Sequence, residues 1–202
     1  FEAQVQAAKC FLAMSQPLRA AAHCEAARQI NGASVDVMLL AGRICEAQKD
    51  YKGAVAIYEQ VSALVPNDPN VMGTLGQAYV KAGEYEQARS VLTNVLGVEP
   101  GRAEALRDLG YCYVKLGRLD EAIAMYRRAI ERNERDWQAH NGLGVAYNLK
   151  AGGGDRRFQT MAIQEWRRSL AVNPDQPKRQ VLERLIRGSS DPKDLSLGDP
   201  NL

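Results

Sequence analysis

The sequence predicts an all-α protein, a right-handed superhelical solenoid of five helix pairs followed by a C-terminal capping helix. Two observations carry this prediction. The chain aligns with itself at a period of 34 residues, and small and large side chains recur at fixed places within each period. Two helices that pack closely need small residues where they touch and large residues beside the contact. Repeats of this kind bury their apolar faces against their neighbours, so we expect them to stack.

Five repeats follow one another, over residues 1–34, 35–68, 69–102, 103–136 and 137–176. The eighth place of the repeat is always small: Ala8, Gly42, Gly76, Gly110 and Gly144. The eleventh place holds Phe11, Cys45, Tyr79, Tyr113 and Tyr147. The twentieth place is alanine throughout, and the twenty-fourth holds Cys24, Tyr58, Leu92, Tyr126 and Trp166, once a six-residue insertion near 150–160 is allowed for. This register predicts two helices, A and then B, in every repeat.

The third repeat shows how one helix pair is encoded. Leu75 and Tyr79 share one face of a predicted helix A over residues 70–82, and Gly83 begins the turn into a helix B over residues 85–96. The glycine of the eighth place and the alanine of the twentieth let the two helices approach closely. Each helix is too short to be stable alone in water, so stacking must supply most of the stability.

The chain departs from the repeat in its last third. Three consecutive glycines interrupt the fifth repeat, and because glycine disfavours helix we expect residues 151–158 to form a flexible, projecting loop. Residues 177–188 predict a capping helix, since its apolar side chains form one stripe: Val181, Leu182, Leu185 and Ile186. Two prolines among Ser, Asp and Gly predict an extended or disordered tail over residues 189–202. The expected domain is therefore one solenoid over residues 1–188.

The repeat resembles the tetratricopeptide repeat (TPR) family, over about residues 1–176. The fourth repeat carries the resemblance in Leu109, Gly110, Tyr113, Gly117, Ala122, Tyr126 and Ala129, and the third in Leu75, Gly76, Tyr79, Gly83, Tyr85, Ala88 and Pro100. The first repeat departs from the pattern, with Ala7 and Ala8 in place of Leu-Gly and Gly32 in place of proline. The resemblance implies a superhelix whose surfaces bind other proteins.

Side chains that could perform catalysis are few. His140 occupies the fourth place of its repeat, where a bulky residue packs, and His23 lies beside Cys24 on a helix, where neighbours point about 100° apart. The four cysteines have no zinc-site spacing. Gly142 and Gly144 lie within a predicted helix, which excludes a dinucleotide-binding loop. We therefore predict a non-enzymatic protein with no catalytic residue, no metal and no cofactor.

Charge and cysteine content restrict the partners and the compartment. The net charge is only +2, so we expect no specific nucleic-acid binding, although residues 127–187 carry 13 Lys/Arg against 7 Asp/Glu. No apolar run predicts a transmembrane segment. Unpaired cysteines favour a cytoplasmic location. The chain begins without Met, so a missing N-terminal segment leaves a periplasmic or membrane-associated location open, and in that case Cys24 and Cys45 are the pair to examine.

The resemblance also implies where a partner would bind. In TPR proteins helix A of each repeat lines a concave groove, and the matching places here hold Lys9, Arg43, Glu46, Thr74, Gln77, Arg107, Asp108, Tyr111, Asn141 and Asn148. Gly73 and Gly142 on the same face could let a partner approach the backbone. The loop adds a second set of candidates: Arg156, Arg157 and Phe158.

Two functions remain open at this point. The first is an adaptor that binds a peptide or protein segment in the concave groove. The alternative is a structural or assembly subunit of a larger complex, which docks through its convex face, its ends, the glycine-rich loop or the tail. A mixed polar groove favours the adaptor, whereas a loop or tail buried on another chain would favour the subunit.

Overall fold

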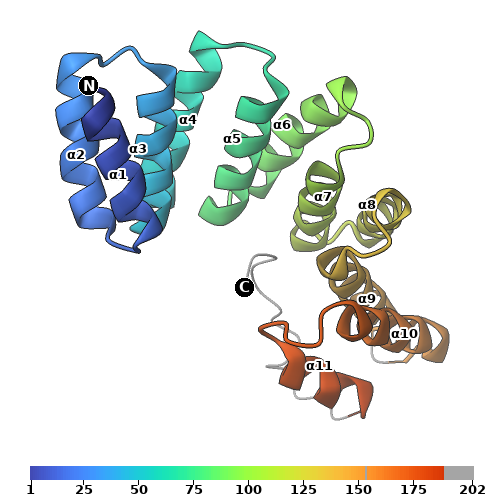
Figure 1. Cartoon of the computed structure of the whole chain (residues 1–202). Coiled ribbons are helices and arrows are strands. Elements are labelled where there is room, and N and C mark those ends of the chain that lie inside the picture. Colours follow the sequence, from blue (N-terminus) through green and yellow to red (C-terminus); the bar gives the residue numbers. More distant parts are fainter. Residues whose placement is uncertain (153, 189–202) are drawn as a thin grey trace. The chain divides into compact units, whose positions relative to one another are not determined.

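The computed structural model describes residues 1–152 and 154–188, and these residues form eleven helices and no strand (Figure 1). The helices are α1 Glu2–Ala13, α2 Pro17–Ile30, α3 Val35–Ala47, α4 Tyr51–Leu64, α5 Pro69–Ala82, α6 Tyr85–Val98, α7 Ala103–Lys115, α8 Leu119–Arg132, α9 Trp137–Ala151, α10 Arg156–Val172 and α11 Arg179–Ile186. The all-helical prediction is confirmed. Each repeat supplies one helix A and one helix B, with odd-numbered helices in the A position from α1 to α9.

The helices begin and end where short polar residues and glycines stand in the sequence. The Asp50 side chain accepts a hydrogen bond from the Gly53 N–H at the start of α4, and Asp68 accepts from two N–H groups at the start of α5. Gly83 adopts the left-handed conformation directly after α5, with φ of 81°. A residue with a Cβ is strained in that conformation, so the glycine ends helix A and turns the chain toward helix B.

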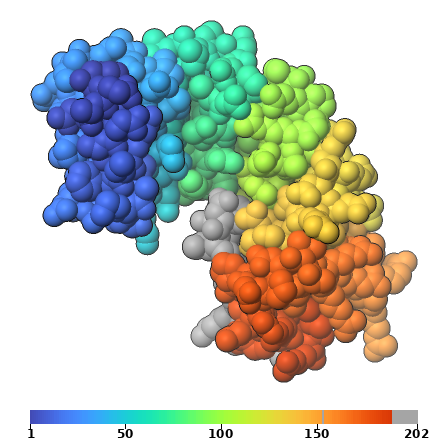
Figure 2. Space-filling view, viewed as in Figure 1, coloured from blue at the N-terminus to red at the C-terminus, as the bar shows by residue number. Residues whose placement is uncertain are grey.

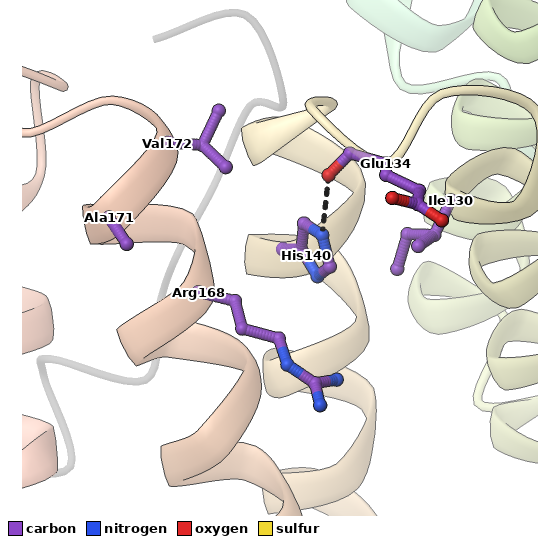
Figure 3. Close-up of a pocket in the computed structure, with 6 residues that line it drawn as sticks. All are labelled: Ile130, Glu134, His140, Arg168, Ala171 and Val172. Carbon is purple, nitrogen blue, oxygen red and sulfur yellow. Dashed lines mark hydrogen bonds between the residues drawn. The ribbon is translucent and has the colours of Figure 1, made fainter.

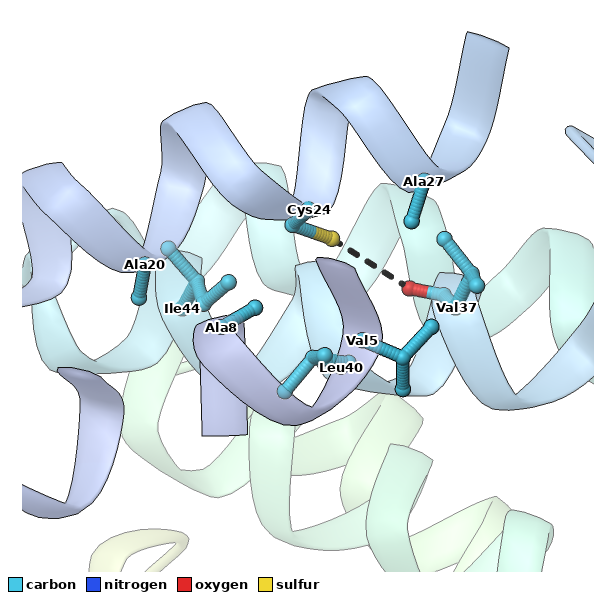
Figure 4. Close-up of a cluster of buried hydrophobic side chains, with 8 residues drawn as sticks. All are labelled: Val5, Ala8, Ala20, Cys24, Ala27, Val37, Leu40 and Ile44. Atoms are coloured by element: carbon cyan, nitrogen blue, oxygen red, sulfur yellow. Dashed lines mark hydrogen bonds between the residues drawn. The ribbon is translucent and has the colours of Figure 1, made fainter. Parts of the chain in front are cut away.

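The chain forms two compact units, and their boundary falls within α6. Unit 1 is Phe1–Val91, and unit 2 begins at Leu92. In unit 1 the core around the first repeat is built from α1, α2 and α3, whose buried side chains are Val5, Ala8, Ala20, Cys24, Ala27, Val37, Leu40 and Ile44 (Figure 4). Figure 2 shows α1 and α2 in blue directly against the lighter α3. The prediction of one continuous solenoid over residues 1–188 stays a prediction.

Unit 2 contains α7 to α11, and its helix pairs pack in chain order, α7 on α8, α8 on α9, and α9 on α10. The capping helix is confirmed in α11, which packs against α10 and buries Leu182 and Leu185. Gly188, with φ of 84°, follows it. The tail predicted for residues 189–202 lies outside the described residues.

The loop expected over residues 151–158 is much shorter in the structure, and this part of the prediction is wrong. Helix α9 continues to Ala151, and α10 begins at Arg156. Most of the insertion therefore lengthens helices: α9 has 15 residues and α10 has 17, against 13 in α7 and 14 in α8. The physical reason is capping, because Gly152 ends α9 in the left-handed conformation and the Asp155 side chain accepts from the Arg157 N–H at the start of α10.

The small eighth place lies against the large twenty-fourth place within a helix pair. A Cβ added to Gly42 would stand 2.3 Å from the Tyr58 ring, and one added to Gly144 would stand 2.5 Å from the Trp166 ring. The close approach predicted for these glycines is therefore confirmed, and the ring that each one accommodates comes from helix B of the same repeat. Gly142 has a similar role, since its Cβ would stand 2.4 Å from the ring of Tyr126 in the preceding repeat. Packing, and not access for a partner, explains Gly142.

Candidate functional site

Arg107 on α7 is tied to the start of α9. Its Nη1 lies 3.2 Å from Asp136 Oδ2, its Nε lies 3.9 Å from Asp108 Oδ1, and its side chain is only 13% exposed. Asp136 has a second role, because its Oδ1 accepts a hydrogen bond from the Ala139 N–H at 2.9 Å and so caps α9. One carboxylate therefore both begins a helix and fixes the arginine of its neighbour.

Tyr111 and Lys115 follow Arg107 at intervals of four residues, so the three lie on one face of α7. Tyr111 is buried, at 8% exposure, and the Lys115 Nζ lies 5.2 Å from its ring centroid, within the range of a cation–π contact. Asp108 is buried as well, at 2%. Most of the surface of Asp108 and Tyr111 is therefore buried against other residues of the protein, whereas Lys115 is exposed to solvent.

Asn141 and Asn148 bring amide groups to the same part of unit 2. They are seven residues apart on α9, about two turns, and so share a face of that helix. Both are half-buried, and the Asn141 Oδ1 is buried with no hydrogen-bond partner among the described residues. We call the set Arg107, Tyr111, Lys115, Asn141 and Asn148 the α7–α9 face.

The candidates in unit 1 are more dispersed. Lys9 and Arg43 are exposed, while Gln77 is half-buried. Glu46 on α3 forms an ion pair of 3.0 Å with Lys81 on α5, so it links two neighbouring A helices. The Thr74 hydroxyl donates to the Asn70 carbonyl oxygen of its own helix at 2.9 Å. In unit 1 the A helices are thus connected through one polar pair.

The candidates from the insertion lie in the first turn of α10. Arg156 and Arg157 are exposed, and Arg157 pairs with the capping Asp155 at 3.1 Å. The Phe158 ring stacks on Tyr147 with centroids 6.1 Å apart, and the Lys150 Nζ lies 5.0 Å from the Phe158 ring centroid. Phe158 therefore packs back onto α9.

A groove that sequence reasoning missed runs along unit 2 between α8 and α10, with α9 as its floor. One hollow of about 440 Å³ is lined by Ile130, Glu134, His140, Arg168, Ala171 and Val172 (Figure 3). A second, of about 380 Å³, shares Ile130 and Arg168 with the first and extends along the same helices to Tyr147 and Met161. We call the two together the outer groove. No sequence pattern could reveal it, because it depends on how far apart two B helices stand.

His140 lies at the floor of the outer groove and joins three elements. Its Nδ1 is 2.7 Å from Glu165 Oε2 on α10. Its Nε2 is 3.1 Å from the carbonyl oxygen of Glu134, which follows α8 (Figure 3). Arg168 Nη1 donates to the other oxygen of Glu165 at 2.6 Å. This hydrogen-bonded arrangement gives the histidine the packing role that its place in the repeat predicts.

The contacts of His140 predict a pH dependence of stability. The hydrogen bond to Glu165 raises the pKa of His140, although burial acts in the opposite direction. A raised folded-state pKa means that the stabilisation is complete below the unfolded value of about 6.5 and is lost as pH rises through the folded value. The unfolding free energy of the wild type should therefore exceed that of His140→Gln most at about pH 5 to 6, and by less toward about pH 9. Urea unfolding across this range tests it, and a pH-independent difference would contradict it.

Three further properties of the described chain concern metal binding, the cysteines and membrane-spanning helices. No group of three His, Cys, Asp or Glu side chains within residues 1–152 and 154–188 could hold a metal ion. All four cysteines are free thiols, and burial raises the pKa of both Cys24 and Cys45. None of the helices in these residues has the length and apolar character needed to cross a bilayer.

Stacked helix pairs with polar A-helix faces define the class of helical-repeat interaction proteins. More narrowly, the chain belongs to the tetratricopeptide repeat family. Two models of this family match it, one over residues 11–71 and 46–93 and the other over residues 74–133 and 113–152. TPR proteins are in general non-catalytic scaffolds for protein–protein interaction. No curated protein matches this chain in sequence.

Solved structures of several TPR proteins share the fold. MamA (41-end) from Desulfovibrio magneticus RS-1 has a TM-score of 0.75 at 19% identity, covering 87% of this chain and 96% of that chain. TTC0263 from Thermus thermophilus has a TM-score of 0.71 at 20% identity, covering 92% and 98%. YrrB, described as a TPR protein with an unusual peptide-binding site, has a TM-score of 0.67 at 19% identity, covering 90% of each chain. At these identities the similarity concerns the fold alone.

Proposed function

We propose that this protein is a non-catalytic adaptor that binds an extended peptide segment of a partner protein on the α7–α9 face. The observation that carries the proposal is that polar groups are held in place on helix A faces. Arg107 is fixed by Asp136, and Lys115 is held against Tyr111. Fixed side chains lose less conformational entropy when a partner binds, so they are suited to recognition. The peptide-binding site of YrrB supports peptide recognition by a protein of this fold.

The chemistry of the α7–α9 face favours the backbone of a peptide over its acidic side chains. The charge of Arg107 is already compensated by Asp136, which leaves Lys115 as the exposed cation of this face. Asn148 can donate and accept, whereas Asn141, whose Oδ1 is buried, can only donate, so together they can pair with the C=O and N–H groups of an extended chain. We infer that the two asparagines supply the main polar contacts and that Lys115 meets a partner carboxylate or carbonyl group.

The test is a binding measurement with a peptide selected on the wild-type protein from a displayed random library. Asn141→Ala/Asn148→Ala should weaken binding by about 2 kcal/mol, because both amide contacts are lost. The matched control is Asn94→Ala, which removes an exposed amide from α6 on a helix B. Fluorescence anisotropy gives the affinities. Equal affinity of the double variant and the wild type would refute the α7–α9 face as the peptide site.

The burial of Arg107 and Tyr111 changes how they can be tested. From the repeat register alone, Arg107→Ala with Tyr111→Ala is expected to weaken partner binding while leaving the fold intact. In the structure Arg107 neutralises Asp136 within the fold, and Tyr111 is buried, so both substitutions should lower stability as well as affinity. The asparagines separate the two effects more cleanly. The assembly-subunit alternative stays a prediction, to be tested on the outer surface.

A further inference from the structure

We propose that the outer groove of unit 2 is a second docking surface, which takes an amphipathic helix carrying basic residues from another protein. This surface is separate from the α7–α9 face, since α8 and α10 form its walls. The proposal rests on three properties of the groove: its size, its apolar floor and the distribution of charge along its walls.

The groove is larger than the comparable hollow in unit 1. There, α2 and α3 enclose about 190 Å³ beside Cys24 and Cys45. In unit 2 the two adjoining hollows measure about 440 and 380 Å³. Both lie along α8 and α10, so the groove is elongated in the direction of its wall helices. An elongated space between two helices is suited to a third helix that inserts apolar residues at intervals of three and four.

The groove presents apolar side chains at its floor and on both walls. Leu143 and Tyr147 of α9 lie beneath it, and Ile130 and Met161 line its sides. At the end of α10, Val172 is 36% exposed although it is a large aliphatic residue. Leu143 and Tyr147 are each only 3% exposed, so a partner would remove apolar surface from water mainly at Ile130, Met161 and Val172.

The cations of the groove are already engaged within the fold. Arg168 donates to Glu165 at 2.6 Å, and the other oxygen of this carboxylate is hydrogen-bonded to His140. Arg127 donates to the Tyr147 hydroxyl at 2.7 Å. Glu165 carries one negative charge, so it balances Arg168 while His140 is neutral, and protonation of His140 adds one positive charge to the floor of the groove. On the α10 wall, Arg168 and Glu165 therefore balance each other, whereas Arg127 on α8 keeps its positive charge.

The α8 side of the groove carries a net negative charge of one, since Glu131 and Glu134 stand against Arg127, whose hydrogen-bond partner Tyr147 is neutral. Glu131 and Glu134 line the groove, both residues are exposed, and neither carboxylate has an ion-pair partner among the described residues. Two further arginines turn to the other side of α8, where Arg128 donates to the Pro100 carbonyl oxygen and the Arg132 guanidinium lies beside Gly101. An apolar floor beside two such carboxylates is complementary to a helix that carries leucine-type residues on one face and lysines or arginines along its edge.

The experiment uses two fluorescein-labelled amphipathic peptides with the same leucine face, one with lysines and one with glutamates at the polar positions. Fluorescence anisotropy gives the affinity of each peptide for the full chain. The wild type should bind the lysine peptide more tightly. Glu131→Lys/Glu134→Lys should change the ratio of the two affinities by about tenfold or more toward the glutamate peptide, because two attractive pairs become repulsive. Val172→Asp should weaken the binding of both peptides.

A matched control separates docking from bulk charge. Glu2→Lys/Asp36→Lys makes the same change in net charge on exposed helix starts of unit 1 and should leave the ratio of affinities close to that of the wild type. Circular dichroism checks that all variants keep their helix content. The proposal is overturned by any of three results: the lysine peptide does not bind, the control changes the ratio as much as the groove variant does, or Val172→Asp leaves both affinities unchanged.

Discussion

Gly144→Leu should destabilise the fifth repeat strongly, by about 3 kcal/mol or more. Even a Cβ at this position would stand 2.5 Å from Trp166 Nε1 and 2.6 Å from Cδ1, distances that packed atoms do not tolerate. Trp166 is 2% exposed and cannot move into solvent without opening the contact between α9 and α10. Leucine adds three more carbons to the same space. Urea unfolding followed by circular dichroism measures the loss.

A series of alanine substitutions separates this clash from the general effect of glycine on helices. Gly144→Ala should destabilise the protein, whereas Gly110→Ala, whose Cβ would stand 3.0 Å from the Tyr126 ring, should be nearly neutral, because the gain in helix propensity offsets the tighter contact. Gly97→Ala should stabilise α6 by about 0.5–1 kcal/mol, since a Cβ there meets nothing within 4 Å.

The order Gly144, Gly110, Gly97 is thus the expected order of stability loss on substitution by alanine. At Gly110, leucine should still overpack the contact and cost about 1–3 kcal/mol. If Gly144→Ala unfolds at the same temperature as the wild type, the described packing of the small eighth place against the large twenty-fourth place is wrong.

Asp136→Ala should cost about 3–5 kcal/mol, because one side chain performs two tasks. It removes the hydrogen bond to the Ala139 N–H that begins α9, and it leaves Arg107, 13% exposed, without its 3.2 Å partner. A buried charge that loses its partner is more costly than either an exposed ion pair or a cap alone. Thermal and urea unfolding of the variant measure the sum of both losses.

Two controls divide this cost between its causes. Asp136→Asn keeps a capping oxygen but removes the negative charge, so it should retain the cap while weakening the hold on Arg107. Asp68→Ala removes the cap of α5 and should cost about 1 kcal/mol. The structure shows cap hydrogen bonds for the Asp68 side chain and no ion pair. If Asp136→Ala and Asp68→Ala are equally destabilising, the ion pair with Arg107 contributes nothing to stability.

The sequence by itself determined the repeat, the helix pairs and the capping helix. The reason is that these features are local and periodic: Gly83 ends a helix through its own backbone, and the apolar stripe of α11 follows from helical spacing alone. The contacts of Gly42 and Gly144 could also be anticipated, since the same small and large places recur in each repeat. Because the same pair of places recurs in each repeat, the pattern is distinguished from a chance occurrence of small and large residues.

Only the tertiary structure decided how the polar groups pair. Arg107 and Asp136 are 29 residues apart, and His140 and Glu165 are 25 apart. The two places of His140 and Glu165 are also hydrogen-bonded in the first repeat, but there they hold Gln4 and His23, so no recurring residue pair indicated the contact. Most of the insertion is helical because Asp155 caps α10. From the sequence alone, the three glycines favoured a loop. The outer groove depends on the spacing of α8 and α10, which the packing of both helices on α9 sets. Distances between elements come from packing, and a single sequence encodes them only through the whole fold.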